Sequence, residues 1–214
     1  MKRILLALMA LNLLGQANSA LAVEEPSYEL IEKSGDIEIR EYRPLIVAET
    51  VVDGELDSAG NRGFRLIAAY IFGDNQSADG KQEKIAMTAP VTVEPEASGK
   101  IAAADTGNHP VSLDAQRWRV EFVMPSQYTL ASLPHPRNPA VTLKEIPVRR
   151  YAVIRFSGFT GQQKVQQKLS ELSDWLHHRG LDTTGAPRLA RYNPPWTLPF
   201  LKRNEIMLEI QPIN

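Results

Sequence analysis

The chain has 214 residues, a formal net charge of −1 and no cysteine. The absence of cysteine excludes disulfide bonds, thiolate metal sites and cysteine nucleophiles. Its 24 lysine and arginine residues nearly balance 25 aspartate and glutamate residues. The sequence therefore has no basic excess to neutralise a phosphate backbone, and we expect no nucleic-acid partner.

The first 22 residues have the pattern of a secretory signal peptide. A basic start at Lys2 and Arg3 precedes an apolar run over residues 4–14, and an Ala-Leu-Ala site ends at Ala22. The run is too short to cross a bilayer as a helix. We predict cleavage after Ala22, a periplasmic or secreted location, and one domain over residues 23–214 without a membrane span. This mature chain has a formal charge of −3, because Lys2 and Arg3 are lost, and we expect it to be a monomer.

Short stretches of alternating or β-branched residues predict strands through most of the mature chain. Residues 27–33 and 37–42 flank Ser34-Gly35-Asp36 and predict a hairpin. Further strands are predicted over residues 45–52, 118–124, 141–146, 151–156, 187–193 and 205–210. The long polar connection over residues 94–117, which contains His109, is predicted to be a mobile excursion of a hairpin.

Two longer stretches have helical periodicity and predict amphipathic helices over residues 57–72 and 161–179. Their apolar stripes are Ala59, Gly63, Leu66, Ile67 and Tyr70 in the first helix, and Val165, Leu169, Leu172 and Leu176 in the second. Thr160 and Gln163 have the spacing of a capping box, which predicts the start of the second helix.

Between the first helix and the polar connection, residues 84–91 read KIAMTAPV. The segment is apolar, lacks an acid and is too short for a helix, and Pro90 argues against a central strand. We predict a core strand that ends at an edge proline, with Met87 and Thr88 packed beneath the first helix.

An internal repeat aligns residues 37–54 with residues 141–158. The matched pairs are Arg40 with Lys144, Glu41 with Glu145, Ala48 with Ala152, and Gly54 with Gly158. A helix and then two strands follow each copy. Two such β-α-β-β units, related by a pseudo-twofold axis, would join their strands into one antiparallel sheet, curled or closed, that the two helices cover. The predicted class is α+β, with a distorted antiparallel β-barrel flanked by two α-helices.

Six motifs in order resemble the SOUL/heme-binding protein family. The first is YEL…IEIREY near the mature start, and the others are GFRLIAAYIFGDN, KIAMTAPV, FVMP, FSGF and the late ARYNPPWTLPFLKRNEI. The resemblance spans nearly the whole mature chain. It implies a distorted antiparallel barrel with a duplicated half, which agrees with the repeat, and binding of heme or another tetrapyrrole.

The resemblance also implies where the ligand binds, in a surface groove between the first helix and the loop before the last strand. A flat, amphiphilic macrocycle needs apolar walls and cations for its carboxylates. The candidate walls are Phe64, Ile67, Tyr192, Trp196, Leu198 and Phe200, and the candidate cations are Arg62, Arg65, Lys202 and Arg203. Solvated arginines, and aromatic residues that only complete the core, are the structural alternative.

Axial ligation of heme iron has few candidates in this chain. Some family members have a proposed axial histidine within the motif that reads IEIREY here, and this chain has Glu41 at that position. The four histidines lie in predicted loops or at a helix end, and Met87 is expected in the core. We therefore predict hydrophobic binding with weak or no axial ligation, and no metal site built from protein ligands.

Three hypotheses for the function follow. The first is an exported protein that carries or buffers heme or a related tetrapyrrole. The second is a heme-modifying or heme-degrading enzyme; no G-x-S-x-G, H-E-x-x-H or phosphate-loop motif supports an enzyme, and no catalytic residue is proposed. The third is an effector- or partner-binding barrel that has lost heme.

Overall fold

The structure is a computed structural model that describes residues 23–96, 113 and 115–211. The predicted signal peptide, residues 1–22, lies outside the described residues. So does most of the predicted mobile connection, with His109.

The described residues form short strands, two long helices and one 3-10 helix. In chain order these are β1 (Tyr28–Ser34), β2 (Ile37–Tyr42), β3 (Leu45–Asp53), α2 (Leu56–Ile71), β4 (Asn75–Gln76), β5 (Val91–Pro95), β6 (Arg117–Val123), β7 (His135–Pro136), β8 (Thr142–Ile146), β9 (Arg149–Phe156), α3 (Gln162–His178), β10 (Thr183–Arg191), η1 (Pro199–Leu201) and β11 (Asn204–Ile210). The predicted first hairpin is confirmed. At its turn Gly35 has a φ of 61°, a left-handed conformation that glycine adopts without a Cβ clash.

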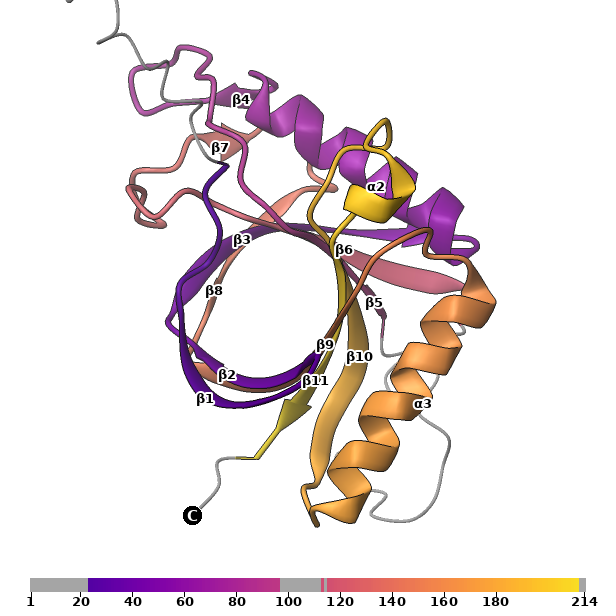
Figure 1. The fold of residues 1–214 in the computed structure, drawn as a ribbon. Coiled ribbons are helices and arrows are strands. Elements are labelled where there is room, and N and C mark those ends of the chain that lie inside the picture. The colour runs from indigo at the N-terminus through magenta and orange to yellow at the C-terminus, as the bar shows by residue number, and fades with distance from the viewer. Residues whose placement is uncertain (1–22, 97–112, 114, 212–214) are drawn as a thin grey trace, which may run out of the picture.

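Nine strands form one antiparallel sheet in the order β1-β2-β9-β11-β10-β5-β6-β3-β8, and β4 pairs with β7 separately. Figure 1 shows the large sheet curling into a ring, with α2 and α3 outside it. The α+β class with two flanking helices is confirmed. In the described part of the chain no ladder joins the edge strands β1 and β8, so of the two predicted forms, curled or closed, the sheet has the curled one and does not close into a barrel.

The internal repeat is visible in the order of the strands. The aligned stretches form β2-β3 and β8-β9, and each pair continues into a helix and two strands, α2-β5-β6 and α3-β10-β11. The equivalent strands are β2 and β8, β3 and β9, β5 and β10, and β6 and β11. If each strand from β2 to β8 in the sheet is replaced by its equivalent, the strand order is reversed. Each half is thus a β-β-α-β-β unit, one strand longer than the predicted unit, and a pseudo-twofold relates the halves.

The two faces of the curled sheet have different surroundings. On β11, Ile206 and Leu208 join the main core beneath the helices, while Glu205 and Met207 face the inner space that the sheet encloses, here called the lumen. α2 packs on β3, β5 and β6, and α3 packs on β9 and β11. The main hydrophobic core therefore lies outside the ring, between sheet and helices.

The helices start and end within a residue of their predicted positions. The apolar stripe of α3 is buried as predicted, but the predicted capping box is wrong: the N-cap is Gly161, without a side-chain cap hydrogen bond, and Thr160 lies one residue outside. No helix in the described part of the chain is long and apolar enough to cross a membrane.

The KIAMTAPV segment differs from its prediction. Only Thr88 forms an isolated bridge, with Glu24, and β5 begins at Val91, after the proline. Met87 is exposed and does not pack beneath α2. Thr88 is buried, and its hydroxyl donates a hydrogen bond to the carbonyl oxygen of Val123 at 2.5 Å. The segment joins the N-terminal residues to the end of β6 instead of adding a strand.

Candidate functional site

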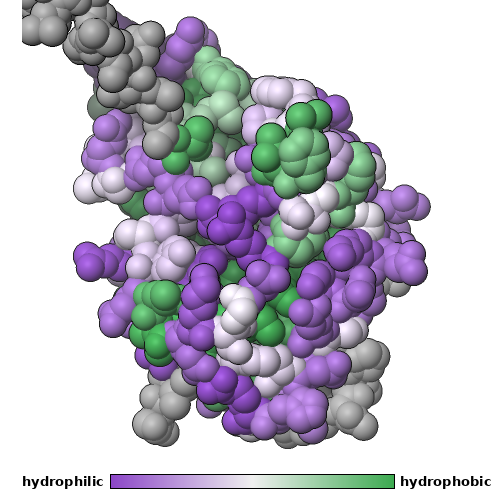
Figure 2. Space-filling model, in the orientation of Figure 1, coloured by the Kyte–Doolittle hydropathy of each residue, from purple (hydrophilic) through white to green (hydrophobic). Residues whose placement is uncertain are grey.

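The most exposed apolar side chains of the predicted site lie on the loop between β10 and β11. Trp196 is 84% exposed, Phe200 71% and Leu198 55%. Phe159 and Leu201, which the sequence analysis did not select, are also exposed. Figure 2 shows hydrophobic side chains gathered over η1, in front of α2. We call these five residues the apolar patch.

Hydrogen bonds hold the loop of the apolar patch against the turn after β9. The amide of Gly158 donates to the carbonyl oxygen of Pro199 at 3.0 Å. The side-chain amide of Asn204 donates to the carbonyl oxygen of Gly158 at 3.0 Å. The ammonium of Lys202 lies 5.3 Å from the centre of the Phe159 ring. These contacts explain why Phe159, distant in sequence, belongs to the patch.

The predicted residues on α2 are divided between surface and core. Arg62 and Arg65 are exposed, and Phe64 is half-buried. Ile67 is only 1% exposed and belongs to the main core, so it cannot line a surface groove. The loop leaves β10 next to the first turn of α2, because Arg191 pairs with Asp57 at 2.5 Å.

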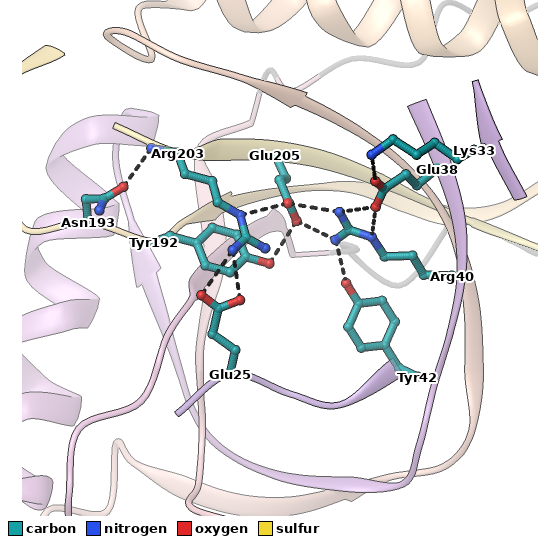
Figure 3. Close-up of polar contacts among 9 residues, drawn as sticks. All are labelled: Glu25, Lys33, Glu38, Arg40, Tyr42, Tyr192, Asn193, Arg203 and Glu205. Carbon is teal, nitrogen blue, oxygen red and sulfur yellow. Dashed lines mark hydrogen bonds and ion pairs between the residues drawn. The ribbon is translucent and has the colours of Figure 1, made fainter. Parts of the chain in front are cut away.

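The remaining two predicted residues, Tyr192 and Arg203, belong to a buried polar cluster in the lumen (Figure 3). Its centre is Glu205, whose carboxylate pairs with Arg40 at 2.8 Å and accepts a hydrogen bond from the Tyr192 hydroxyl at 2.8 Å. Arg203 pairs with the same carboxylate at 3.0 Å and lies 3.6 Å above the Tyr192 ring. We call these residues, with Tyr42, the lumen cluster.

The pKa values of Arg40, Tyr42 and Tyr192 in the lumen cluster are all raised. Burial alone would lower the pKa of Arg40, but the hydrogen bond and charge of Glu205 raise it above the ordinary value. Burial raises the pKa of Tyr42 to about 12 and also raises that of Tyr192, to which the charge of Glu205 adds. Arg40 therefore stays charged and both hydroxyls stay protonated. The cluster is a network of ion pairs and hydrogen bonds within the protein, and Tyr192 and Arg203 both take part in it.

A second charged cluster also lines the lumen. Arg188 pairs with Glu121 at 2.9 Å and with Glu94 at 2.5 Å, and Arg119 pairs with Glu94 at 2.8 Å. Burial raises the pKa of Glu121 above its ordinary value of 4.5, against the opposing effect of Arg188.

This shift predicts a pH-dependent contribution of Glu121 to stability. The folded state holds the Glu121 proton more tightly than the unfolded state, so the contribution is full below about pH 4.5 and is lost as the pH rises through the raised pKa. Urea unfolding of the wild type and Glu121→Gln across pH 4–7 should show the wild type losing stability relative to the variant as the pH rises. A constant difference would contradict the shift.

The described histidines lie away from the apolar patch, and Glu41, at the position of the proposed axial histidine, is engaged in an ion pair. Glu41 pairs with Arg150 at 2.7 Å. Of the described histidines, His135 lies on β7, and His177 and His178 lie at the C-terminal end of α3, opposite the end that follows Phe159 in the chain. The described part of the chain thus brings no histidine to the patch.

Comparison with known proteins defines the family. The sequence model described as "SOUL heme-binding protein" matches residues 23–209. The chain therefore belongs to the SOUL heme-binding protein family, as its motifs predicted.

The curated relatives carry a more specific name. The chain is 31% identical to "Heme-binding protein 2" of Homo sapiens over 196 residues, which cover 89% of this chain and 87% of the human protein. It is also 31% identical to the Mus musculus protein of the same name over 164 residues, 74% of this chain and 72% of that protein.

Solved structures show the fold alone. A hydrolase from Listeria innocua superposes with a TM-score of 0.58 at 15% identity and covers 82% of this chain and 92% of its own. The EcmrR C-terminal domain superposes with a TM-score of 0.57 at 12% identity and covers 87% and 99%. At this identity the likeness concerns the fold and not the activity of this chain.

Proposed function

We propose that this protein is an exported heme- or tetrapyrrole-binding protein that carries or buffers its ligand. Membership of the SOUL family and two relatives named heme-binding protein support the ligand class. The leader-like residues 1–22 support export. The apolar patch is the observation that supports the position of the binding site. Exposed patches of large apolar side chains mark interaction sites, because water contact with them is unfavourable.

The chemistry of the patch suits one face of a tetrapyrrole. Trp196, Phe200 and Phe159 offer aromatic surfaces on which a flat, conjugated ring can stack. Lys202 lies at the patch beside the Phe159 ring and would meet a propionate carboxylate. Arg65, exposed on α2, is a second candidate for a carboxylate partner. These residues would bind and orient the macrocycle. When bound, heme would supply an iron centre for redox chemistry.

The binding mode that we propose uses hydrophobic contact without an axial histidine. The described histidines lie on β7 and at the end of α3, away from the patch. Metal-free porphyrin should therefore bind the mature protein with an affinity within a few-fold of that of ferric heme. Binding of ferric heme alone would show that iron ligation, which this proposal omits, controls affinity.

Replacement of the two most exposed aromatic side chains tests the position of the site. Trp196→Ala and Phe200→Ala should each weaken porphyrin binding about tenfold, because each removes a stacking surface worth roughly 1–1.5 kcal/mol. Absorption titrations with metal-free porphyrin give the dissociation constants. Phe72→Ala is the matched control, since Phe72 is an exposed aromatic residue at the other end of α2. If Trp196→Ala and Phe200→Ala bind porphyrin as tightly as Phe72→Ala does, the ligand binds elsewhere.

A further inference from the structure

A second candidate site lies at the open end of the curled sheet, apart from the apolar patch. A hollow of about 610 Å³ lies between the N-terminal residues 24–27, the turn from β2 to β3, and the loop that follows β6. We call it the rim hollow. Its volume lies within the range of small-molecule sites, roughly 300–1,000 Å³, and the mouth of a curled sheet is a frequent place for them.

The rim hollow has apolar walls. Leu45 and Ile46 line it from β3, Val123 from the end of β6, and Met124 and Leu130 from the loop beyond. Such walls can remove the apolar body of a ligand from water, which stabilises binding in proportion to the apolar area buried.

A second cavity lies next to the hollow, on the side of the lumen. This smaller cavity, of about 40 Å³, shares Pro26, Arg43, Leu45 and Val123 with the rim hollow. Tyr151 lines this inner cavity, is 5% exposed, and its hydroxyl has no hydrogen-bond partner among the described residues. A buried hydroxyl without a partner is costly, so a ligand that reaches it gains a hydrogen bond that the protein does not supply.

The charges around the hollow favour one sign of ligand. Three carboxylates line it, those of Glu24, Glu25 and Glu145, against the single cation of Arg43. Glu25 is paired with Arg203 at 2.8 Å. Glu24 accepts a hydrogen bond from the amide of Ser126 at 2.8 Å, and within the described ranges neither Glu24 nor Glu145 has a cationic partner. These carboxylates would repel an anion, whereas a cation would form an ion pair with them.

We propose that the rim hollow binds an organic cation with an apolar body, a protonated or quaternary amine. Its charge lies at Glu145 and Glu24, its apolar body packs on Leu45 and Val123, and its deepest polar group reaches the hydroxyl of Tyr151. This site is independent of the tetrapyrrole site, because the residues that line the rim hollow and those of the apolar patch do not overlap.

A matched set of probes tests the charge preference. The mature protein is titrated with 4-tert-butylbenzylammonium, with 4-tert-butylbenzoate and with the neutral 4-tert-butylbenzyl alcohol, and backbone amide resonances report the position of binding. The cation should bind at least tenfold more tightly than either analogue and shift the resonances of residues 43–46 and 123–130. Tighter binding of the benzoate would show that the hollow binds an anion at Arg43, which would overturn the proposal. Absence of binding of the cation would also overturn it.

Variants separate this site from the apolar patch. Glu145→Gln should weaken binding of the cation about threefold, and Glu145→Gln with Glu24→Gln about tenfold. Glu29→Gln, a change of an exposed acid on β1 outside the hollow, should leave it unchanged. Trp196→Ala should weaken porphyrin binding and leave cation binding unchanged, so either proposal can fail alone. Equal affinity of the glutamate double variant and the wild type would contradict the assignment.

Discussion

Replacing Glu205 with glutamine should lower the free energy of unfolding by about 3 kcal/mol, the largest effect that we expect from one polar substitution. The Glu205 side chain is fully buried and that of Arg40 is 3% exposed. Glutamine keeps the shape but removes the negative charge, which leaves the Arg40 guanidinium in the lumen with Glu38, at 2.7 Å, as its one remaining charged partner among the described residues. Urea unfolding at pH 7 gives the difference.

A control on the same strand shows whether burial causes the effect. Glu209 also faces the lumen side of β11 and pairs with Arg149, but this pair is partly exposed. Exposed or partly exposed pairs contribute about 0–1 kcal/mol, so Glu209→Gln should change stability by less than 1 kcal/mol. Equal losses of stability in the two variants would show that the buried lumen cluster stabilises the fold no more than a partly exposed ion pair does.

Replacing Gly63 with alanine should destabilise the protein by about 1–2 kcal/mol, although alanine is the better helix former by roughly 0.5–1 kcal/mol. A Cβ at this position would lie 2.5 Å from Val120 Cγ2 and 2.6 Å from Val120 Cβ. The Cβ of Val120 is fixed by its strand, so α2 must move away from β6, and overpacking of this kind costs roughly 1–3 kcal/mol.

Gly60, one turn earlier on the same helix, is the matched control. A Cβ there would first meet the end of the Arg191 side chain at 3.2 Å, which can shift. Gly60→Ala should therefore be neutral or stabilise the protein by several tenths of a kcal/mol. Thermal or urea unfolding of both variants checks the pair. A stabilised Gly63→Ala protein would mean that α2 does not pack as closely on β6 as the structure shows.

The sequence predicted the helices and strands better than it predicted whether the sheet closes. The period of two in IEIREY and the helical stripe ending at Leu176 each depend on neighbours in the chain, and both are confirmed. The internal repeat also predicted the helix pair and one antiparallel sheet. Whether the edges β1 and β8 meet depends on the accumulated curl of nine strands, which no local pattern encodes.

The candidate site was harder to predict, because a loop residue can point outward or inward. Trp196 and Tyr192 belong to one aromatic motif, but the first is exposed and the second hydrogen-bonds to Glu205 in the lumen. The pairing of Arg40 with Glu205 joins residues 165 positions apart and arises only from the sheet order. The sequence pattern itself argues against Ile67 as a groove residue, since it lies on the apolar stripe of α2 that faces the core.

One signal for the lumen cluster was present in the sequence. On β2 the polar residues Glu38 and Arg40 alternate with Ile37 and Ile39, and on β11 Glu205 alternates with Ile206. Such alternation normally indicates a solvent-facing side. In a curled sheet the same pattern can instead line an enclosed, charged interior. The curl of the whole sheet decides between these two interpretations.

The indole N–H resonances of the three tryptophans provide the most direct test of tetrapyrrole binding on the apolar patch. The mature protein is titrated with metal-free porphyrin, whose ring current shifts nearby protons, and Trp196→Phe assigns the resonance. Trp118, which is buried and donates to the Gly54 carbonyl oxygen at 2.7 Å, and Trp175 on α3 are internal references. We predict a saturable shift of the Trp196 resonance that is much larger than those of Trp118 and Trp175. Saturable porphyrin binding with an unmoved Trp196 resonance, or no binding at all, would contradict this account.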